Sequence, residues 1–118
     1  MSDDPRLSLR LHFASGLTFG RGKADLLQGI DEEGSISAAG RRMAMSYRRA
    51  WSLVEEMNGH FDSPLVDSNR GGAKGGGAVL TARGHEVLAD YRALEDTLRA
   101  KGAEPLARLS RGQRSVSA

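Results

Sequence analysis

The sequence lacks cysteine altogether, which excludes disulfide bonds, thiolate metal sites and cysteine nucleophiles. It also has no apolar run close to the roughly 18 residues that a membrane-spanning helix needs. The first residues, Met1 to Pro5, are polar and acidic, unlike the start of a secretory signal. Together these absences predict a soluble, cytoplasmic protein without a membrane partner.

A large excess of one charge is missing as well, because 17 basic and 15 acidic residues leave a formal net charge of +2. The distribution of charge is nevertheless uneven. The segment from Ser35 to Arg49 contains four arginines and no carboxylate, whereas Asp31, Glu32 and Glu33 lie just before it. Concentrated positive charge is typical of a surface that faces phosphate. An ordinary solvated face would also explain it.

The apolar periodicity predicts a mainly α-helical fold with a small β-hairpin. Residues 7–13 alternate between apolar and polar types, which predicts a half-buried strand. Later segments repeat apolar residues at spacings of three and four, and each is bounded by a serine, a threonine or a glycine. We expect helices over about 23–33, 36–43, 47–58, 82–101 and 104–109, with hairpin strands at 65–66 and 78–80. This order of elements is that of a winged helix-turn-helix followed by a long helix.

Two local details of the helix over 47–58 follow from its sequence. We expect it to end at Asn58-Gly59, because glycine accepts the left-handed conformation that often follows a helix. Its buried side should be a stripe with helical spacing. The stripe consists of Tyr47, Ala50, Val54 and Met57.

Residues 35–58 have the features of a helix-turn-helix. Ala38, Ala39 and Gly40 supply small side chains where two helices must cross at close range, and Met43 and Met45 flank the turn. The second helix leaves its N-terminal end free to enter the major groove of DNA. The residues expected to contact base edges there are Ser46, Tyr47, Arg48 and Arg49. Those expected to contact the phosphate backbone are Ser37, Arg41 and Arg42. A helical hairpin with exposed arginines and no DNA is the alternative.

The hairpin loop, at about 68–78, is predicted to act as a DNA-binding wing. Arg70 and Lys74 lie there among five glycines, so the loop can follow a groove closely and present two cations to phosphate. A nucleotide-binding phosphate loop is excluded because Lys74 follows Ala73, no serine or threonine follows it, and the chain continues as a strand. A linker without regular structure remains the alternative.

The long helix is predicted to form a homodimer, because its apolar stripe is too long for a core of this size to cover. The stripe consists of Leu88, Tyr91, Leu94 and Leu98. We accordingly expect a flexible N-terminus at 1–6, a winged helix-turn-helix domain at 7–81, C-terminal dimerisation helices at 82–109 and a disordered tail at 110–118.

Two other classes of function were weighed. An enzyme is not expected, because His12, His60 and His85 are scattered over different elements without metal-ligand spacing and no serine lies in a nucleophile-elbow motif. We therefore predict no catalytic residue, no metal site and no cofactor. A winged helix that binds another protein, such as a separate sensor, is the remaining alternative. The basic start of the second helix, at Arg48 and Arg49, favours DNA over this reading.

Several motifs resemble a known family. They are Gly34-Ser35-Ile36-Ser37, Ala39, Ser46-Tyr47, Ala50-Trp51, Glu56-Met57-Asn58, Leu65-Val66, and the run from Gly71 to Thr81 followed by Gly84. Together they resemble the N-terminal DNA-binding domain of the ModE-type molybdate-responsive transcriptional regulators over about Leu7 to Leu98. The looser helix-turn-helix pattern is similar to that of LysR-type regulators.

The resemblance implies a homodimeric transcriptional regulator that binds an inverted-repeat operator. The recognition helix, residues 46–58, would enter the major groove and the wing would lie against the adjacent groove. Full-length members of the family carry a C-terminal pair of small β-barrel domains that bind molybdate. The sequence has no strand-rich segment after Leu98, so we expect this domain to be missing and do not carry molybdate over as a ligand.

Overall fold

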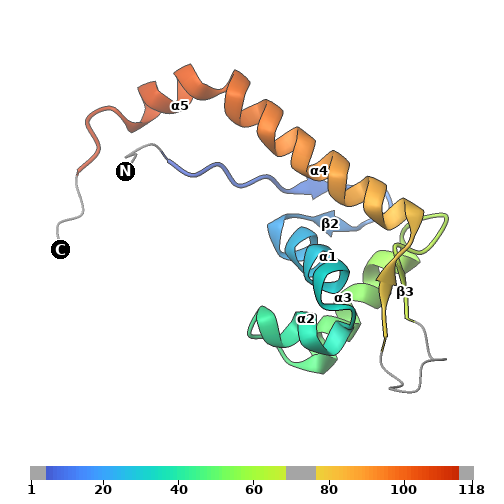
Figure 1. Cartoon of the computed structure of the whole chain (residues 1–118). Helices are drawn as coiled ribbons and strands as arrows, with labels where there is room; N and C mark the ends of the chain where they lie inside the picture. The colour runs from blue at the N-terminus through green and yellow to red at the C-terminus, as the bar shows by residue number, and fades with distance from the viewer. Residues whose placement is uncertain (1–4, 69–76, 115–118) are drawn as a thin grey trace.

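The computed structural model describes residues 5–68 and 77–114 and confirms a mainly helical fold with a winged helix-turn-helix (Figure 1). Three helices form a compact body, and a longer helix crosses it and extends beyond it. The elements are β1 (Leu11–His12), β2 (Thr18–Phe19), α1 (Arg21–Glu33), α2 (Ile36–Arg42), α3 (Tyr47–Gly59), β3 (Val66–Asp67), β4 (Val79–Leu80), α4 (Ala82–Lys101) and α5 (Ala103–Ser110). None of the helices described is long and apolar enough to cross a membrane.

The N-terminal strand is part of a hairpin that the sequence analysis did not predict in full. The expected alternation is present, because Leu9 and Leu11 are half-buried while Arg10 is exposed. Only β1 forms a ladder, however, and it pairs antiparallel with β2. Gly16, with φ of 100°, makes the turn between them. The partner strand is two residues long and bounded by glycine, so its own pattern is too short to reveal it.

Serine caps begin the second and third helices and a glycine ends the first, as predicted. Ser35 and Ser46 begin α2 and α3, and each side chain accepts a hydrogen bond from the backbone N–H three residues later. Gly34 ends α1 in the left-handed conformation. Ala44, with φ of 58°, makes the turn between α2 and α3, and the Met45 N–H donates to the Gly40 carbonyl.

Two close contacts between small residues bring these helices together. A Cβ atom added to Gly29 would lie 3.2 Å from the Ala39 Cβ, where α1 crosses α2. A Cβ atom added to Gly40 would lie 3.1 Å from the Ala50 Cβ, where α2 meets α3. The predicted role of Ala39 and Gly40 in the crossing is therefore confirmed.

Two details predicted for α3 are wrong. Tyr47 is 56% exposed, because it lies in the first turn, where the end of the helix projects past the core. Leu53 takes its place in the buried stripe beside Ala50, Val54 and Met57. Gly59 does not adopt the left-handed conformation either. It is the last helical residue, and His60 follows it with φ of −107°.

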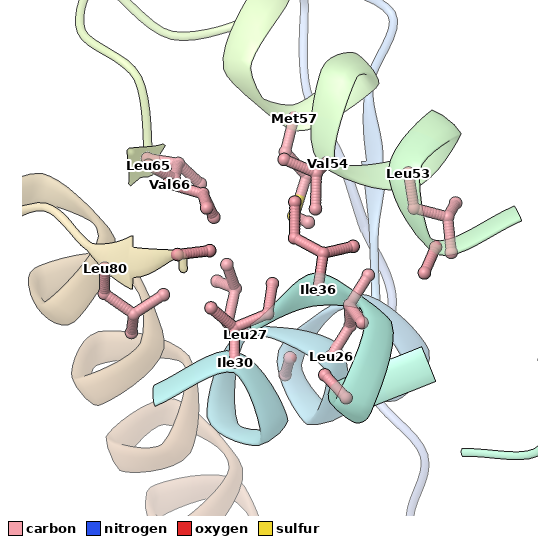
Figure 2. Close-up of a cluster of buried hydrophobic side chains, with 14 of the residues drawn as sticks. Leu26, Leu27, Ile30, Ile36, Leu53, Val54, Met57, Leu65, Val66 and Leu80 are labelled. Carbon is pink, nitrogen blue, oxygen red and sulfur yellow. The ribbon is translucent and has the colours of Figure 1, made fainter. Parts of the chain in front are cut away.

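The core lies where α1, α2, α3 and the wing strands meet (Figure 2). Its larger side chains are Leu26, Leu27, Ile30, Ile36, Val54, Met57, Leu65, Val66 and Leu80. The wing hairpin thus contributes to the same core as the helix-turn-helix. Its register pairs Val66 with Leu80 and Asp67 with Val79, and β4 packs against α1.

Helix α4 begins at Thr81, whose hydroxyl accepts from the Gly84 N–H as predicted. Its first half packs on the body, and Tyr91 is only 3% exposed. The Tyr91 hydroxyl donates to the Leu9 carbonyl at 2.7 Å, and its ring meets Phe19 edge to face. Burial raises the pKa of the Tyr91 phenol, so the hydroxyl stays protonated and remains a donor.

Helix α4 packs closely on the segment just before β3 at Gly84, and this close packing can be tested by its effect on stability. A Cβ atom at this position would clash with the Leu65 carbonyl oxygen just before β3, so the helix or that segment must shift. We expect Gly84→Ala to lower the free energy of unfolding by roughly 1–3 kcal/mol, measured by urea denaturation. Gly59→Ala is the control, because a Cβ atom there meets open space. Equal midpoints for the two variants would contradict the tight contact.

Candidate nucleic-acid interface

The start of α3 is an exposed, positively charged helix end. Ser46, Tyr47, Arg48 and Arg49, the residues predicted to contact base edges, are all exposed. The Ser46 hydroxyl accepts from the Arg49 N–H at 3.0 Å, which holds the first turn in place. Within residues 5–68 and 77–114, the guanidinium groups of Arg48 and Arg49 form no ion pair or hydrogen bond. Both side chains are therefore available to a ligand.

The two arginines face different hollows. Arg48 lines a shallow hollow with Tyr47, Trp51 and Ser52. Arg49 lines a separate groove between α3 and the start of α1. Successive residues of a helix point about 100° apart, which accounts for this division. Trp51 is half-buried against the core.

Helix α2 presents Ser37 and Arg41 together and keeps Arg42 apart. An Arg41 guanidinium nitrogen donates to the Ser37 hydroxyl at 2.8 Å, and Arg41 is exposed. Arg42 instead forms ion pairs with Glu32 at 2.6 Å and Glu33 at 3.3 Å. Hydrogen bonds from Gln28 and Arg42 lower the pKa of Glu32, so that carboxylate stays charged. The carboxylates at the end of α1 thus offset the charge of one predicted phosphate contact.

The base of the wing is anchored to α3 by one side chain. The Asn58 amide oxygen accepts from the N–H groups of Leu65 at 2.8 Å and Val66 at 3.1 Å. Its amide nitrogen donates to the Val66 carbonyl at 3.0 Å. This anchor fixes where the wing leaves the body. Arg70 and Lys74, the predicted wing contacts, lie outside the described residues.

The predicted dimer stripe divides into a covered half and an exposed half. Tyr91 lies in the core, and Leu88 is half-buried against it. Leu94 and Leu98 are 37% and 38% exposed. A salt-bridge network fastens α4 just before them, where Arg92 donates to Asp25 and Gln28 at 2.8 Å. The orientation of the exposed half is thereby set relative to α1.

The histidines occupy separate surface positions. The His60 Nδ1 atom lies 2.9 Å from the Ser15 hydroxyl, which joins the turn of the first hairpin to the end of α3. His85 lies on the surface 3.8 Å from Asp31. In the part of the chain that the structure describes, no group of three histidine or carboxylate side chains is arranged to hold a metal ion.

Three basic residues beside α3 were not predicted from the sequence. Arg10, Arg21 and Lys23 line the groove that contains Arg49. They come from the N-terminal segment and the first turn of α1, whereas the predicted interface comprised only the helix-turn-helix and the wing. The one local signal was the alternation of glycine and basic residues over 20–23.

Comparison with known proteins confirms the resemblance to the ModE-type regulators. Over 81 residues the chain is 43% identical to the molybdenum-pterin-binding protein MopB of Rhodobacter capsulatus, covering 69% of this chain and 30% of MopB. Over 69 residues it is 39% identical to the DNA-binding transcriptional dual regulator ModE of Escherichia coli K12, covering 58% of this chain and 26% of that regulator. The chain thus matches less than a third of the length of these relatives. No family profile matches it.

Among solved structures, the fold is similar to the CbnR DNA-binding domain determined in complex with DNA. The TM-score is 0.59 at 20% identity, and the match covers 75% of this chain and 95% of that domain. At this identity the likeness concerns the fold, and it confirms the winged helix-turn-helix.

The Asn58 anchor leads to a prediction about the base of the wing. We expect Asn58→Ala to lower the free energy of unfolding by about 1–3 kcal/mol, because two N–H groups lose their acceptor. Hydrogen exchange at the Leu65 and Val66 amides should accelerate more than elsewhere, as measured by NMR. Ser52→Ala, at an exposed position of the same helix, serves as the control. Unchanged exchange at both amides would show that the wing does not depend on Asn58.

Proposed function

Because the chain is a homologue of the ModE and MopB proteins over the segment that it shares with them, we propose that it is a transcriptional regulator that binds double-stranded DNA. The observation that carries this proposal is the start of α3. It combines a capped helix end, exposed residues and two arginines that form no ion pair within the described chain. A helix end of this kind fits the major groove of B-DNA.

Within this proposal, base edges are contacted from the hollow lined by Tyr47, Arg48 and Ser52. The Arg48 guanidinium has the geometry to bond guanine O6 and N7 together, and the Ser46 cap leaves the helix end open to a phosphate. The Ser37–Arg41 pair contacts the backbone on the α2 side. Arg70 and Lys74 of the wing would contact the adjacent groove. Arg42 contributes less, because Glu32 and Glu33 already neutralise it.

We further propose that the chain acts as a homodimer through the exposed half of α4. Leu94 and Leu98 lie one turn apart on a helix that extends past the body (Figure 1). Two copies joined there would bury both leucines and present two α3 helices related by two-fold symmetry. That arrangement matches an inverted-repeat operator.

Arg48 offers the most direct test of sequence readout. A duplex selected by the protein from a random pool and a shuffled duplex of the same composition are compared by fluorescence anisotropy. We expect Arg48→Ala to weaken binding to the selected duplex by about 1–3 kcal/mol and to reduce the preference over the shuffled duplex. Arg99→Ala removes the same charge from α4, where Arg99 is exposed and paired with Asp96, and should leave the preference intact.

Two outcomes would count against parts of this proposal. Equal losses on both duplexes would make Arg48 a phosphate contact. A wild-type protein that binds neither duplex at low salt would contradict DNA binding and favour a protein-interaction module.

The dimer proposal is tested at Leu98. We expect Leu98→Glu to convert a dimer into a monomer, because a buried unpaired carboxylate is costly at an apolar interface. Light scattering measures the molar mass directly. Thr97→Glu introduces the same charge at the neighbouring exposed position and should remain dimeric. A dimer that persists in Leu98→Glu would place the interface elsewhere.

A further inference from the structure

A groove of about 390 Å³ lies beside the recognition helix, between α3, the start of α1 and the N-terminal segment. Its basic residues are Arg10 from the N-terminal segment, Arg21 and Lys23 from the first turn of α1, and Arg49 from the first turn of α3. No carboxylate lines the groove, although the chain as a whole has nearly as many acidic as basic residues.

The arginines of the groove differ from those on the far helices. On α4 and α5, the residues Arg83, Arg92, Arg99 and Arg108 each form an ion pair with a carboxylate. Arg10, Arg21 and Arg49 form no ion pair or hydrogen bond through their guanidinium groups within the described part of the chain. Lys23 is committed elsewhere, since its ammonium group donates to the Thr18 carbonyl and lies 3.5 Å from Glu56.

The backbone that carries Arg10 is held firmly in place. A Cβ atom added to Gly20 would lie 3.4 Å from the Leu9 carbonyl oxygen, so the N-terminal segment packs directly on the start of α1. The Tyr91 hydroxyl donates to the same carbonyl at 2.7 Å. Arg10 therefore enters the groove from a segment that the core positions, and this limits the ordering that a ligand must impose on it.

We propose that this groove binds a backbone phosphate of DNA next to the major groove that α3 enters. This inference rests on the proposed function and extends the interface to two arginines outside the helix-turn-helix. Three arginines line this groove, and their guanidinium groups have no ion-pair partner among residues 5–68 and 77–114. Such groups suit a phosphodiester, which accepts forked hydrogen bonds from arginine. Arg49 accordingly contacts phosphate, while Arg48, one residue earlier, reads bases.

The position of the groove favours DNA as the source of the anion. Arg49 and Met45 lie at or near the start of α3, the end that enters the major groove. The sugar-phosphate backbones of the two DNA strands border the major groove and pass on either side of a recognition helix. A free inorganic oxyanion would use the same chemistry, so the test includes it as a separate arm.

The experiment measures the salt dependence of binding. Arg10→Gln, Arg21→Gln and Arg49→Gln are titrated against the selected and shuffled duplexes over a salt series. Each lost phosphate contact should reduce the slope of log K against log salt by about 0.9. The ratio of affinities for the two duplexes should stay unchanged. Arg99→Gln is the control of equal charge and should keep the wild-type slope, and circular dichroism verifies that every variant is folded.

The second arm adds inorganic phosphate to the protein without DNA, followed by NMR. Wild-type DNA binding with unchanged slopes in Arg10→Gln and Arg21→Gln would overturn the groove assignment and leave the proposed function standing. The slopes of log K against log salt could also stay unchanged while the protein binds phosphate saturably and Arg21→Gln abolishes that binding. This result would assign the groove to a free oxyanion instead. Failure of the wild-type protein to bind any duplex would overturn both proposals.

Discussion

The close approach of three helices through glycine and alanine is the constraint on which the structure depends. Gly29 faces Ala39 where α1 crosses α2, and Gly40 faces Ala50 where α2 meets α3. A Cβ atom added to either glycine would lie closer to the alanine than an ordinary van der Waals contact. A larger side chain at either crossing would separate the helices and open the core between them. The Gly40 carbonyl also accepts from Met45, so the same crossing sets the turn. The exposure of the start of α3 follows from this geometry.

A second set of contacts fixes α4 on this body. Gly84 packs against the Leu65 carbonyl, Tyr91 donates to Leu9, and Arg92 reaches Asp25 on α1. Gly84 lies about two helical turns before the neighbouring residues Tyr91 and Arg92, so the helix cannot pivot without breaking at least one of these contacts. In the proposed dimer, the spacing of the two recognition helices would then be set by a rigid path from α3 to the exposed end of α4. Half-site spacing depends on such a path.

Paired and unpaired charges lie in different parts of the molecule, although the net charge is only +2. Arginines of α4 and α5 are balanced by carboxylates within three or four residues, as is usual for solvated helix surfaces. Arg10, Arg21 and Arg49 lack such neighbours at hydrogen-bonding distance within the described chain. These arginines line one groove beside the start of α3, where their charge would attract a polyanion. The position of Arg42 in the sequence predicts a phosphate contact, but a carboxylate from α1 pairs with its guanidinium group.

The sequence by itself determined the helix limits and the class of fold. The caps at Ser46 and Thr81 and the stop at Gly34 depend on atoms three or four residues away, and local pattern predicts such contacts well. Only the tertiary structure decided that Tyr91 belongs to the core and that Arg10 joins the recognition helix. The hydrogen bond from Tyr91 to Leu9 joins residues that are 82 positions apart. The periodicity of the sequence does not indicate which distant backbone group a side chain will contact. Packing of separate elements makes that choice, because burial rewards whichever surfaces fit together.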